Sequence, residues 1–423
     1  MATSHSETRA KRELFAVTAP GLESIAAGEL KALGIKPCQE PGGVAFDGDL
    51  ERIYQTNLWL RTASRVLVRM ARFHASTFYE LERRAKKVDW AAFLPATGSV
   101  EVRVTCRKSR LYHSDAVAER VLAAIARVAP HVVNVAAPSH EDSDGEETGA
   151  EIEESLASAD AVVTRQSFVV RIVDDECEIS ADTSGALLHR RGYRQEVAKA
   201  PLRETLAAAM VLASGWQKNQ PLLDPLCGAG TIAIEAALVA RRFAPGLQRQ
   251  FQFMNWPNFD RALWSETVSK AKEATLSVPL DIRGADRDAG ATQAALRNAR
   301  RAGVAGDIRF SPEPVSASFA SLKDVAERGG WIITNPPYGI RIGESADLRD
   351  LYATLGSAVK ARAGWRIGLL AADDSLAGQL RLAMRPRFET RNGGIPVRYM
   401  VSEQLQPKAS ERNTPVMAKE REA

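Results

Sequence analysis

In the second half of the chain, apolar residues occur in short uninterrupted runs, each followed by a turn and a helix-forming segment. Residues 221–223 and 331–333 are such runs and predict buried strands, and residues 282–286 predict another short strand. Helices are predicted over residues 232–238 and 290–302, which are rich in alanine. Strands that alternate with helices are typical of an α/β fold with a mostly parallel, doubly wound sheet.

The first half of the chain shows the alternation of apolar and polar residues that half-buried strands have. Val100, Val102 and Val104 alternate with polar residues, for example, and Gly34 follows the last apolar position of a helix, where a C-terminal cap is expected. This order predicts small α+β units. The predicted strands cover residues 14–18, 42–46, 65–73, 99–106 and 167–172, and the predicted helices cover residues 20–33, 50–57 and 116–128.

Length and composition indicate a globular protein of a reducing compartment. The 423 residues have room for two or three domains, and 45% of them are apolar. No run of 18 apolar residues occurs, and residues 1–12 are too polar for a signal peptide, so we expect a cytoplasmic protein without a membrane span. The four cysteines form no CxxC pair and the six histidines have no ligand spacing, so we expect no metal site.

The net charge of +4 is unevenly distributed along the chain. Residues 52–130 contain 15 Lys or Arg against 6 Asp or Glu, a local net charge of +9, whereas residues 139–159 contain eight acids and no Lys or Arg. We interpret the acidic stretch as a solvated loop. The basic region is either an ordinary charged surface or a face that contacts the phosphates of RNA or DNA.

Residues 224–231, Asp-Pro-Leu-Cys-Gly-Ala-Gly-Thr, connect a predicted strand to a predicted helix. Gly228 and Gly230 let the backbone approach a ligand closely, and the N-terminus of the helix offers free N–H groups. No Gly-Lys-Ser/Thr follows, so this is not a phosphate loop, and the three-glycine spacing of a dinucleotide fingerprint is missing. A ligand with a carboxylate fits such a turn; the alternative is a glycine-rich turn that binds nothing.

An acid stands at the end of the next predicted strand. Asp286 ends residues 282–286, where a carboxylate typically accepts hydrogen bonds from ribose hydroxyls. Asp288 is a rival for that role, but it is equally placed to cap the following helix. Asp286 is therefore the predicted ribose-binding residue.

Residues 335–338, Asn-Pro-Pro-Tyr, follow the predicted strand 331–333. The two prolines remove two backbone donors and leave carbonyls that can only accept hydrogen bonds. Asn335 adds a side-chain acceptor and Tyr338 adds a flat aromatic face. This hook suits a planar exocyclic amine, such as that of adenine, cytosine or guanine; the alternative is a simple strand-to-turn transition.

One aromatic segment lies outside these motifs. Residues 252–259, Gln-Phe-Met-Asn-Trp-Pro-Asn-Phe, could form a platform for bases. The segment lies between the first helix and the second strand of the predicted sheet, where an insertion must pack on that sheet. We therefore expect packing rather than binding.

Taken together, the glycine turn, the acid after the second strand and the hook resemble the class I S-adenosylmethionine-dependent methyltransferases that methylate amines. The resemblance implies a Rossmann-like sheet and S-adenosylmethionine as the cofactor. It assigns the amine to the catalytic residues Asn335, Pro336 and Tyr338, and it makes Glu313, after the strand at residues 307–310, a candidate to read the adenine amine of the cofactor. The implied cofactor-binding residues are Asp224, Cys227, Gly228, Gly230, Thr231 and Asp286.

The first half resembles a ferredoxin-like segment followed by a THUMP domain, a module found on RNA-modifying enzymes. The phrases that carry the likeness lie at residues 43–46, 60–66 and 108–113, and those at 188–194 and 200–207 mark the join to the second half. Over residues 14 to about 404 the chain is similar to bacterial large-subunit ribosomal RNA guanine-N2 methyltransferases. The implied domains are residues 1–58 (ferredoxin-like), 59–182 (THUMP), 183–406 (methyltransferase) and a disordered tail, 407–423.

The resemblance implies that structured RNA is the partner, with large-subunit ribosomal RNA first among the choices. The predicted RNA-binding residues are Arg107, Lys108, Arg110, Arg191 and Arg194. Three alternatives stay open: a transfer RNA guanine-N2 methyltransferase, a DNA adenine-N6 methyltransferase and a non-catalytic RNA-binding assembly factor. The hook chemistry alone does not choose guanine over adenine.

Overall fold

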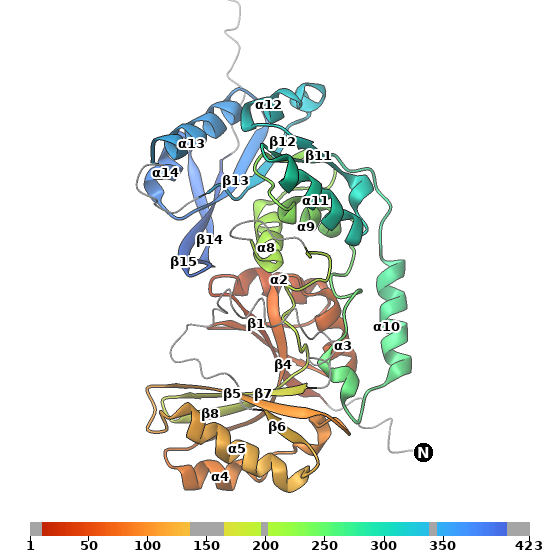
Figure 1. Cartoon of the computed structure of the whole chain (residues 1–423), viewed down its shortest axis with the longest axis vertical. Helices are drawn as coiled ribbons and strands as arrows, with labels where there is room; N and C mark the ends of the chain where they lie inside the picture. Colours follow the sequence, from red (N-terminus) through yellow and green to blue (C-terminus); the bar gives the residue numbers. More distant parts are fainter. Residues whose placement is uncertain (1–10, 136–164, 196–201, 338–344, 404–423) are drawn as a thin grey trace, which may run out of the picture.

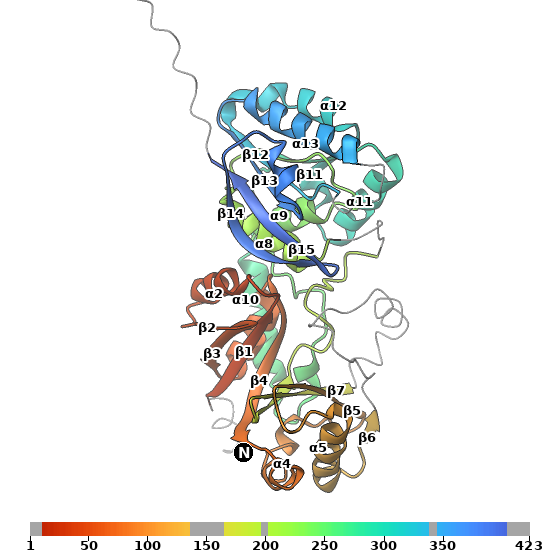
Figure 2. The same cartoon turned by 90° about the vertical axis from the view of Figure 1, so that its left-hand side faces the viewer.

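The computed structural model describes residues 11–135, 165–195, 202–337 and 345–403. These residues form two sheets, one in each half of the chain, which follow one another along the long axis of the molecule (Figure 1). Seen from the side, the hairpin β14–β15 (Met384–Asn392 and Ile395–Ser402) reaches from the second half toward helix α2 (Glu23–Ala32) of the first (Figure 2). Gly21, just before α2, lies so close to Glu389 that a Cβ atom there would come within 1.9 Å of the Glu389 carbonyl oxygen.

Within the described residues, the first half forms one eight-stranded sheet with helices on it. Side chains start two of these helices: Asp49 accepts a hydrogen bond from the Arg52 N–H, and Thr77 forms a capping box with Glu80. In sheet order the strands are β2 (Cys38–Glu40), β3 (Gly43–Gly48), β1 (Arg12–Thr18), β4 (Ala63–His74), β8 (Glu176–Asp182), β7 (Arg165–Val173), β5 (Ser99–Arg107) and β6 (Val133–Val135); the helices are α2, α3 (Leu50–Trp59), α4 (Phe78–Ala85), the short η1 (Ala91–Phe93) and α5 (Ser114–Val128).

Strand β4 belongs to both parts of this sheet. It pairs antiparallel with β1, where Val68 lies opposite Leu14, and antiparallel with β8, where Val68 lies opposite Ala181. The ferredoxin-like and THUMP segments therefore share a continuous sheet. The predicted division between residues 58 and 59 falls in the last turn of α3, and the domain bounds stay a prediction.

The second half contains the predicted doubly wound sheet. The order of its strands reverses at β9, so that β10 and β11 lie on one side of it and β12 and β13 on the other, all parallel; the antiparallel hairpin β14–β15 completes the sheet. In sheet order the strands are β11 (Ile308–Pro312), β10 (Ile282–Asp286), β9 (Leu222–Asp224), β12 (Gly330–Thr334), β13 (Trp365–Ala371), β15 and β14. In parallel sheets, ligands bind beyond the carboxyl ends of the strands, at such a reversal.

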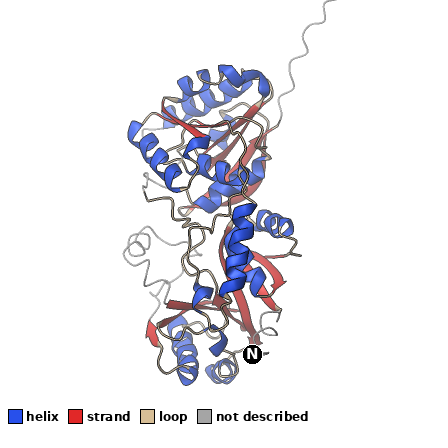
Figure 3. Cartoon of the chain, turned by 90° about the vertical axis from the view of Figure 1, so that its right-hand side faces the viewer, coloured by secondary structure: helices blue, strands red, loops and turns tan. Residues whose placement is uncertain are grey.

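Helices cover both faces of this sheet (Figure 3). Trp331 and Ile333 of β12 pack into one core and Ile332 into the other, which explains why the run is apolar at every position. The helices of the first core are α8 (Glu204–Ser214), α9 (Thr231–Ala240) and α11 (Ala289–Arg301), and those of the second are α12 (Val315–Ala320), α13 (Ser345–Lys360) and α14 (Asp374–Gly378); η3 (Ala305–Asp307) and η4 (Lys323–Arg328) are short turns.

The aromatic segment is buried, as predicted, but its partner differs from the expected one. Phe253 stacks on Tyr54 of α3 with ring centroids 4.6 Å apart, and the Trp256 indole N–H donates to the Gln166 side chain at 2.7 Å. The segment, with its short η2 (Gln252–Asn255), thus packs on the first half rather than on its own sheet, and α10 (Arg261–Glu273) runs beside α3 (Figure 1). The composition of the segment predicts its burial, but it does not predict which surface covers it, because that surface comes from a distant part of the chain.

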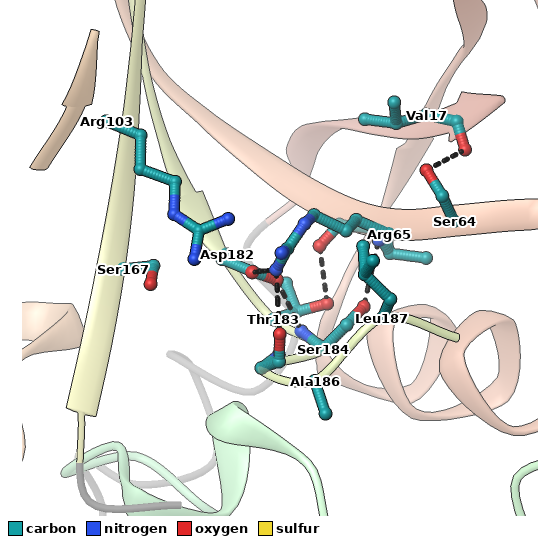
Figure 4. A network of polar contacts seen from close by, with 12 residues as sticks. Val17, Ser64, Arg65, Arg103, Ser167, Asp182, Thr183, Ser184, Ala186 and Leu187 are labelled. Carbon is teal, nitrogen blue, oxygen red and sulfur yellow. Dashed lines mark hydrogen bonds and ion pairs between the residues drawn. The ribbon is translucent and has the colours of Figure 1, made fainter. Parts of the chain in front are cut away.

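The segment that leaves β8 toward the second half is held against β4 by polar contacts (Figure 4). Arg65 forms an ion pair with Asp182 and donates to the Gly185 carbonyl at 2.7 Å. The backbone N–H and the hydroxyl of Thr183 both donate to the Val66 carbonyl, at 3.0 and 2.7 Å. These bonds fix the path of the chain between its two halves.

Candidate active site

The glycine turn lies at the carboxyl edge of the sheet, where β9 ends and α9 begins. The Cys227 N–H donates to the Ala285 carbonyl of β10 at 2.8 Å, which ties the turn to the neighbouring strand. Gly230 has φ of 83°, and a Cβ atom there would lie 2.8 Å from the Cβ of Ala295 and 3.1 Å from the ring of Phe310. Only glycine fits this position. No side chain caps the first turn of α9, so N–H donors at the start of the helix point to the edge of the sheet.

Asp286 ends β10 beside this turn and stabilises it. One carboxylate oxygen accepts the Gly228 N–H at 3.0 Å and the other accepts the Asp288 N–H, also at 3.0 Å. A carboxylate has about four acceptor positions, so both oxygens can accept further hydrogen bonds, as ribose binding requires. Asp288 accepts the N–H of Gly290 at 2.7 Å and starts α11, which confirms its alternative reading as a helix cap.

Asp224 is 1% exposed and lies beneath the turn. Its Oδ1 accepts a hydrogen bond from the Thr334 hydroxyl at 2.7 Å and a second from the Leu226 N–H at 3.2 Å. Burial is the largest cause that raises the pKa of this carboxyl to about 7; the two hydrogen bonds act against it, and the nearby charge of Asp286 acts with it. The side chain thus joins the turn to β12; its predicted contact with the cofactor stays a prediction, as does that of Thr231.

The hook follows β12 directly. Asn335 is half-buried, and its Oδ1 is shielded from solvent yet has no hydrogen-bond partner among the described residues. Pro336 is buried and Pro337 is exposed. Tyr338 lies outside the described residues. A shielded acceptor without a partner is costly in a folded protein, which favours a site that awaits a donor from a ligand.

Glu313 follows β11 and carries a similar acceptor. The register pairs Asp286 with Pro312, so Glu313 lies one residue beyond the end of the ladder, at the same edge as the turn. Its Oε2 is shielded and has no partner in the part of the chain that the structure describes. This geometry supports its candidacy as the reader of the adenine amine.

Cys227 is buried within the turn, in a setting that disfavours its thiolate. Burial raises the pKa of its thiol well above the ordinary value, and the charges of Asp224 and Asp286 act in the same direction. Since the thiolate is the reactive form of cysteine, this residue fills space rather than reacts.

Sequence reasoning missed Asn298, which holds the turn from the opposite side. Its side-chain N–H donates to the Ala229 carbonyl at 3.1 Å, and the guanidinium of Arg301 donates to its Oδ1. Asn298 is 1% exposed in a helix otherwise rich in alanine and arginine. The signal available in the sequence was a single amide side chain on the apolar face of this helix, because a buried amide needs hydrogen-bond partners.

The RNA contacts of Arg191 and Arg194 stay a prediction, which the structure does not favour, because both guanidinium groups make contacts within the protein. Arg191 is 3% exposed and donates to the carbonyls of Leu188 and Arg61, both at 2.5 Å. Arg194 donates to the Leu202 carbonyl at 2.6 Å and pairs with Glu204 at 3.2 Å. Both arginines join parts of the fold.

Arg107, the last residue of β5, and Lys108 and Arg110, which follow it before α5, are in contrast exposed. Asp175 orders this loop, because its carboxylate accepts the Ser109 hydroxyl at 2.7 Å and the Arg110 N–H at 2.8 Å. Sequence reasoning gave no role to two exposed aromatic side chains of the first half: Tyr112, beside the loop, is 69% exposed, and Tyr79, in the first turn of α4, is 73% exposed. Exposed tyrosines beside cations are typical of surfaces that bind nucleic acid.

The described residues contain neither a candidate metal site nor a candidate membrane span. No group of three or more His, Cys, Asp or Glu side chains could hold a metal ion there. No helix in those parts of the chain is long and apolar enough to cross a membrane.

Comparison with known proteins gives a family to each part of the chain. The model of the RlmL ferredoxin-like domain matches residues 13–67, the THUMP model matches residues 75–141, and the RMKL-like methyltransferase domain matches residues 191–400. A protein of Synechocystis sp. named "Putative RNA methyltransferase slr0064" is 36% identical over 393 residues, which are 91% of this chain and 95% of that protein. This chain belongs to the THUMP-containing class I RNA methyltransferases.

Two further similarities bear on this RNA methyltransferase. The "Ribosomal RNA large subunit methyltransferase K/L" of Syntrophotalea carbinolica is 34% identical over 398 residues, which are 92% of this chain but 53% of that protein, so the chain spans about half of that relative. The solved structure of SMU.472, described as "a putative methyltransferase complexed with SAH", has a TM-score of 0.78 and 28% identity, and covers 94% of this chain and 99% of that one.

S-adenosylmethionine is the cofactor of this methyltransferase, and the residues present fit it. The uncapped start of α9 offers N–H donors to the carboxylate of the methionine part. The oxygens of Asp286 can accept ribose hydroxyls, and Glu313 has an acceptor without a partner, which suits an adenine amine. The doubly wound sheet and the cofactor implied by the sequence are thus confirmed.

Proposed function

We propose that this protein methylates the exocyclic N2 amine of a guanosine in large-subunit ribosomal RNA, in the cytoplasm. The observation that carries the proposal is the Asn335 Oδ1, a shielded acceptor without a described partner, at the carboxyl edge of the sheet beside the glycine turn. A primary amine supplies the two N–H donors that this oxygen and the Pro336 carbonyl would accept.

The chemistry explains why two acceptors are needed. The lone pair of an exocyclic guanine amine is conjugated with the ring, so the amine is a poor nucleophile. Acceptance of its N–H protons by Asn335 and Pro336 localises the lone pair, and stacking on Tyr338 holds the ring in place. The cofactor supplies a methyl group on a sulfonium, and the base must first leave its stack in the RNA.

The protein lowers the barrier by placing the two reactants rather than by covalent chemistry. The glycine turn, Asp286 and Glu313 orient the methyl donor, whereas the hook orients the acceptor. Correct placement of two bound reactants is worth about 7–11 kcal/mol of a barrier. No nucleophilic side chain is needed, in keeping with the buried thiol of Cys227.

The exposed loop of the THUMP segment supports RNA as the substrate. Arg107, Lys108 and Arg110 offer cations to phosphates, and Tyr112 and Tyr79 offer faces on which unpaired bases stack. Ribosomal RNA is favoured over transfer RNA by the similarity to the ribosomal RNA methyltransferase of Syntrophotalea carbinolica. The choice of guanine N2 rests on the resemblance of the whole chain to the bacterial large-subunit ribosomal RNA guanine-N2 methyltransferases.

The test uses methyl-labelled S-adenosylmethionine and three substrates from cells that lack the gene for this protein: large ribosomal RNA, transfer RNA and genomic DNA. We expect label in large ribosomal RNA, recovered as N2-methylguanosine after digestion to nucleosides. Label in transfer RNA alone or in DNA adenine would contradict the proposal. Absence of label from every substrate, with cofactor bound, would instead favour an assembly factor.

The variant Asn335→Ala tests the hook itself. We expect cofactor binding within about twofold of the wild type and a loss of turnover of about 100-fold or more, the usual cost of removing one preorganised hydrogen-bonding group from a reacting centre. Calorimetry with S-adenosylhomocysteine measures the first quantity and single-turnover methylation measures the second. A loss of cofactor affinity in place of turnover would mean that Asn335 belongs to the cofactor site.

A further inference from the structure

The two strands that carry the cofactor turn and the hook separate at the site. β9 and β12 are paired only at Leu222 with Trp331 and at Leu223 with Ile332. Beyond these pairs no backbone ladder joins the strands, although the turn and the hook both begin there. Under the proposed function, their separation sets the distance between the methyl donor and the acceptor amine.

A hydrogen bond between side chains takes over where the ladder stops. The Thr334 hydroxyl donates to Asp224 Oδ1 at 2.7 Å, and both residues are buried, with exposures of 0% and 1%. The same oxygen accepts the Leu226 N–H at 3.2 Å, within the cofactor turn. One carboxylate oxygen therefore links the residue before Asn335 to the start of that turn.

The bond lies in the interior, since both of its residues are buried. Within the described residues, Asp224 Oδ1 accepts from two donors, the Thr334 hydroxyl and the Leu226 N–H, at the reversal of strand order. In this buried environment, the loss of one donor leaves the Asp224 carboxyl oxygen short of a partner and lets the ends of the two strands move apart.

We propose that Thr334 is a positioning residue for methyl transfer, which sets the distance from the cofactor turn to Asn335 through its bond to Asp224. The proposal rests on the proposed function of Asn335 as the acceptor of the substrate amine. A displacement of about 1 Å in such an arrangement costs about 100-fold in rate. Thr334 touches neither reactant, so its effect falls on turnover rather than on the binding of either one.

The test compares Thr334→Val, which keeps the shape and removes the hydroxyl, with Thr334→Ser, which keeps the hydroxyl. We expect Thr334→Val to lower single-turnover kcat by about tenfold to 100-fold, with Kd for S-adenosylhomocysteine and for RNA within about twofold of the wild type. Thr334→Ser is expected to restore kcat to within about threefold. Unchanged kcat in Thr334→Val, or equal losses in the valine and serine variants, would overturn the proposal.

Two measurements separate this proposal from its premise. If Asn335→Ala keeps full turnover, the proposed function of the hook fails; if Asn335→Ala loses turnover and Thr334→Val does not, only the role of Thr334 fails. Where Thr334→Val does not fold, Thr334→Cys replaces the hydroxyl by a weak thiol donor, and it should lower kcat while it keeps cofactor affinity. A cysteine variant with lower cofactor affinity and normal kcat would contradict the positioning role.

Discussion

Gly230→Ala tests whether the cofactor turn needs a glycine for two separate reasons. Gly230 has φ of 83°, and a left-handed conformation costs a residue with a Cβ atom about 1–2 kcal/mol. The new Cβ would also lie 2.8 Å from the Cβ of Ala295, which has no flexible side chain to move aside. Overpacking of this kind costs about 1–3 kcal/mol. The free energy of unfolding should therefore fall by about 2–5 kcal/mol.

Gly303→Ala is the matched control, because it separates the two costs. Gly303 has φ of 76°, and nothing lies within 4 Å of a Cβ atom there. This variant should lose only the conformational part, about 1–2 kcal/mol, and bind cofactor normally.

The assays are denaturation by urea and calorimetry with S-adenosylhomocysteine. Gly230→Ala should weaken binding at least about tenfold, since relief of the clash displaces the start of α9, where the cofactor carboxylate is expected to bind. If the two variants were equally stable and bound cofactor equally well, the close approach at Gly230 would be irrelevant and the reasoning refuted.

Three other outcomes are expected. In the wild type, the buried carboxyl of Asp224, with a pKa of about 7, keeps its proton in the folded state while the unfolded chain releases it, so the free energy of unfolding falls as the pH rises from about 4 to 7. Asp224→Asn should make this fall less steep. Denaturation at several pH values that gives the same dependence of the unfolding free energy on pH for both proteins would contradict this. Asn298→Leu should weaken S-adenosylhomocysteine binding by about tenfold, because the hydrogen bond from Asn298 to the Ala229 carbonyl is lost. If calorimetry finds no change in affinity, Asn298 has no role in the turn. Arg110→Ala should weaken RNA binding and reduce the slope of log Kd against log salt by about one, whereas Arg385→Ala, a change of an exposed arginine on the β14 edge, should leave both unchanged.

Local patterns were sufficient for the elements that carry the chemistry. The strand predicted at residues 282–286 has the observed bounds, and the glycine turn, the cap Asp288 and the order of strands and helices are confirmed. Each of these depends on residues within a few positions of one another, where backbone preferences and alternation of apolar residues act.

Contacts between distant segments were not readable in this way. Arg191 looked like a cation for RNA, yet it donates to the Arg61 carbonyl, 130 positions away, and lies in the interior. The aromatic segment at residues 252–259 was expected on its own sheet, but its Phe253 stacks on Tyr54. A side chain's burial depends on which surface reaches it, and one sequence without its fold does not specify that surface.

The amino-acid sequence by itself determined the family, the cofactor and the residues of the turn and the hook, because these are short motifs with a fixed order. Only the tertiary structure decided how the motifs are held together. The bond from Thr334 to Asp224, the amide of Asn298 on the turn and the shielded oxygen of Asn335 all arise where separate strands and helices meet. The physical reason is that hydrogen bonds between side chains depend on distances of about 3 Å, which the packing of whole elements sets.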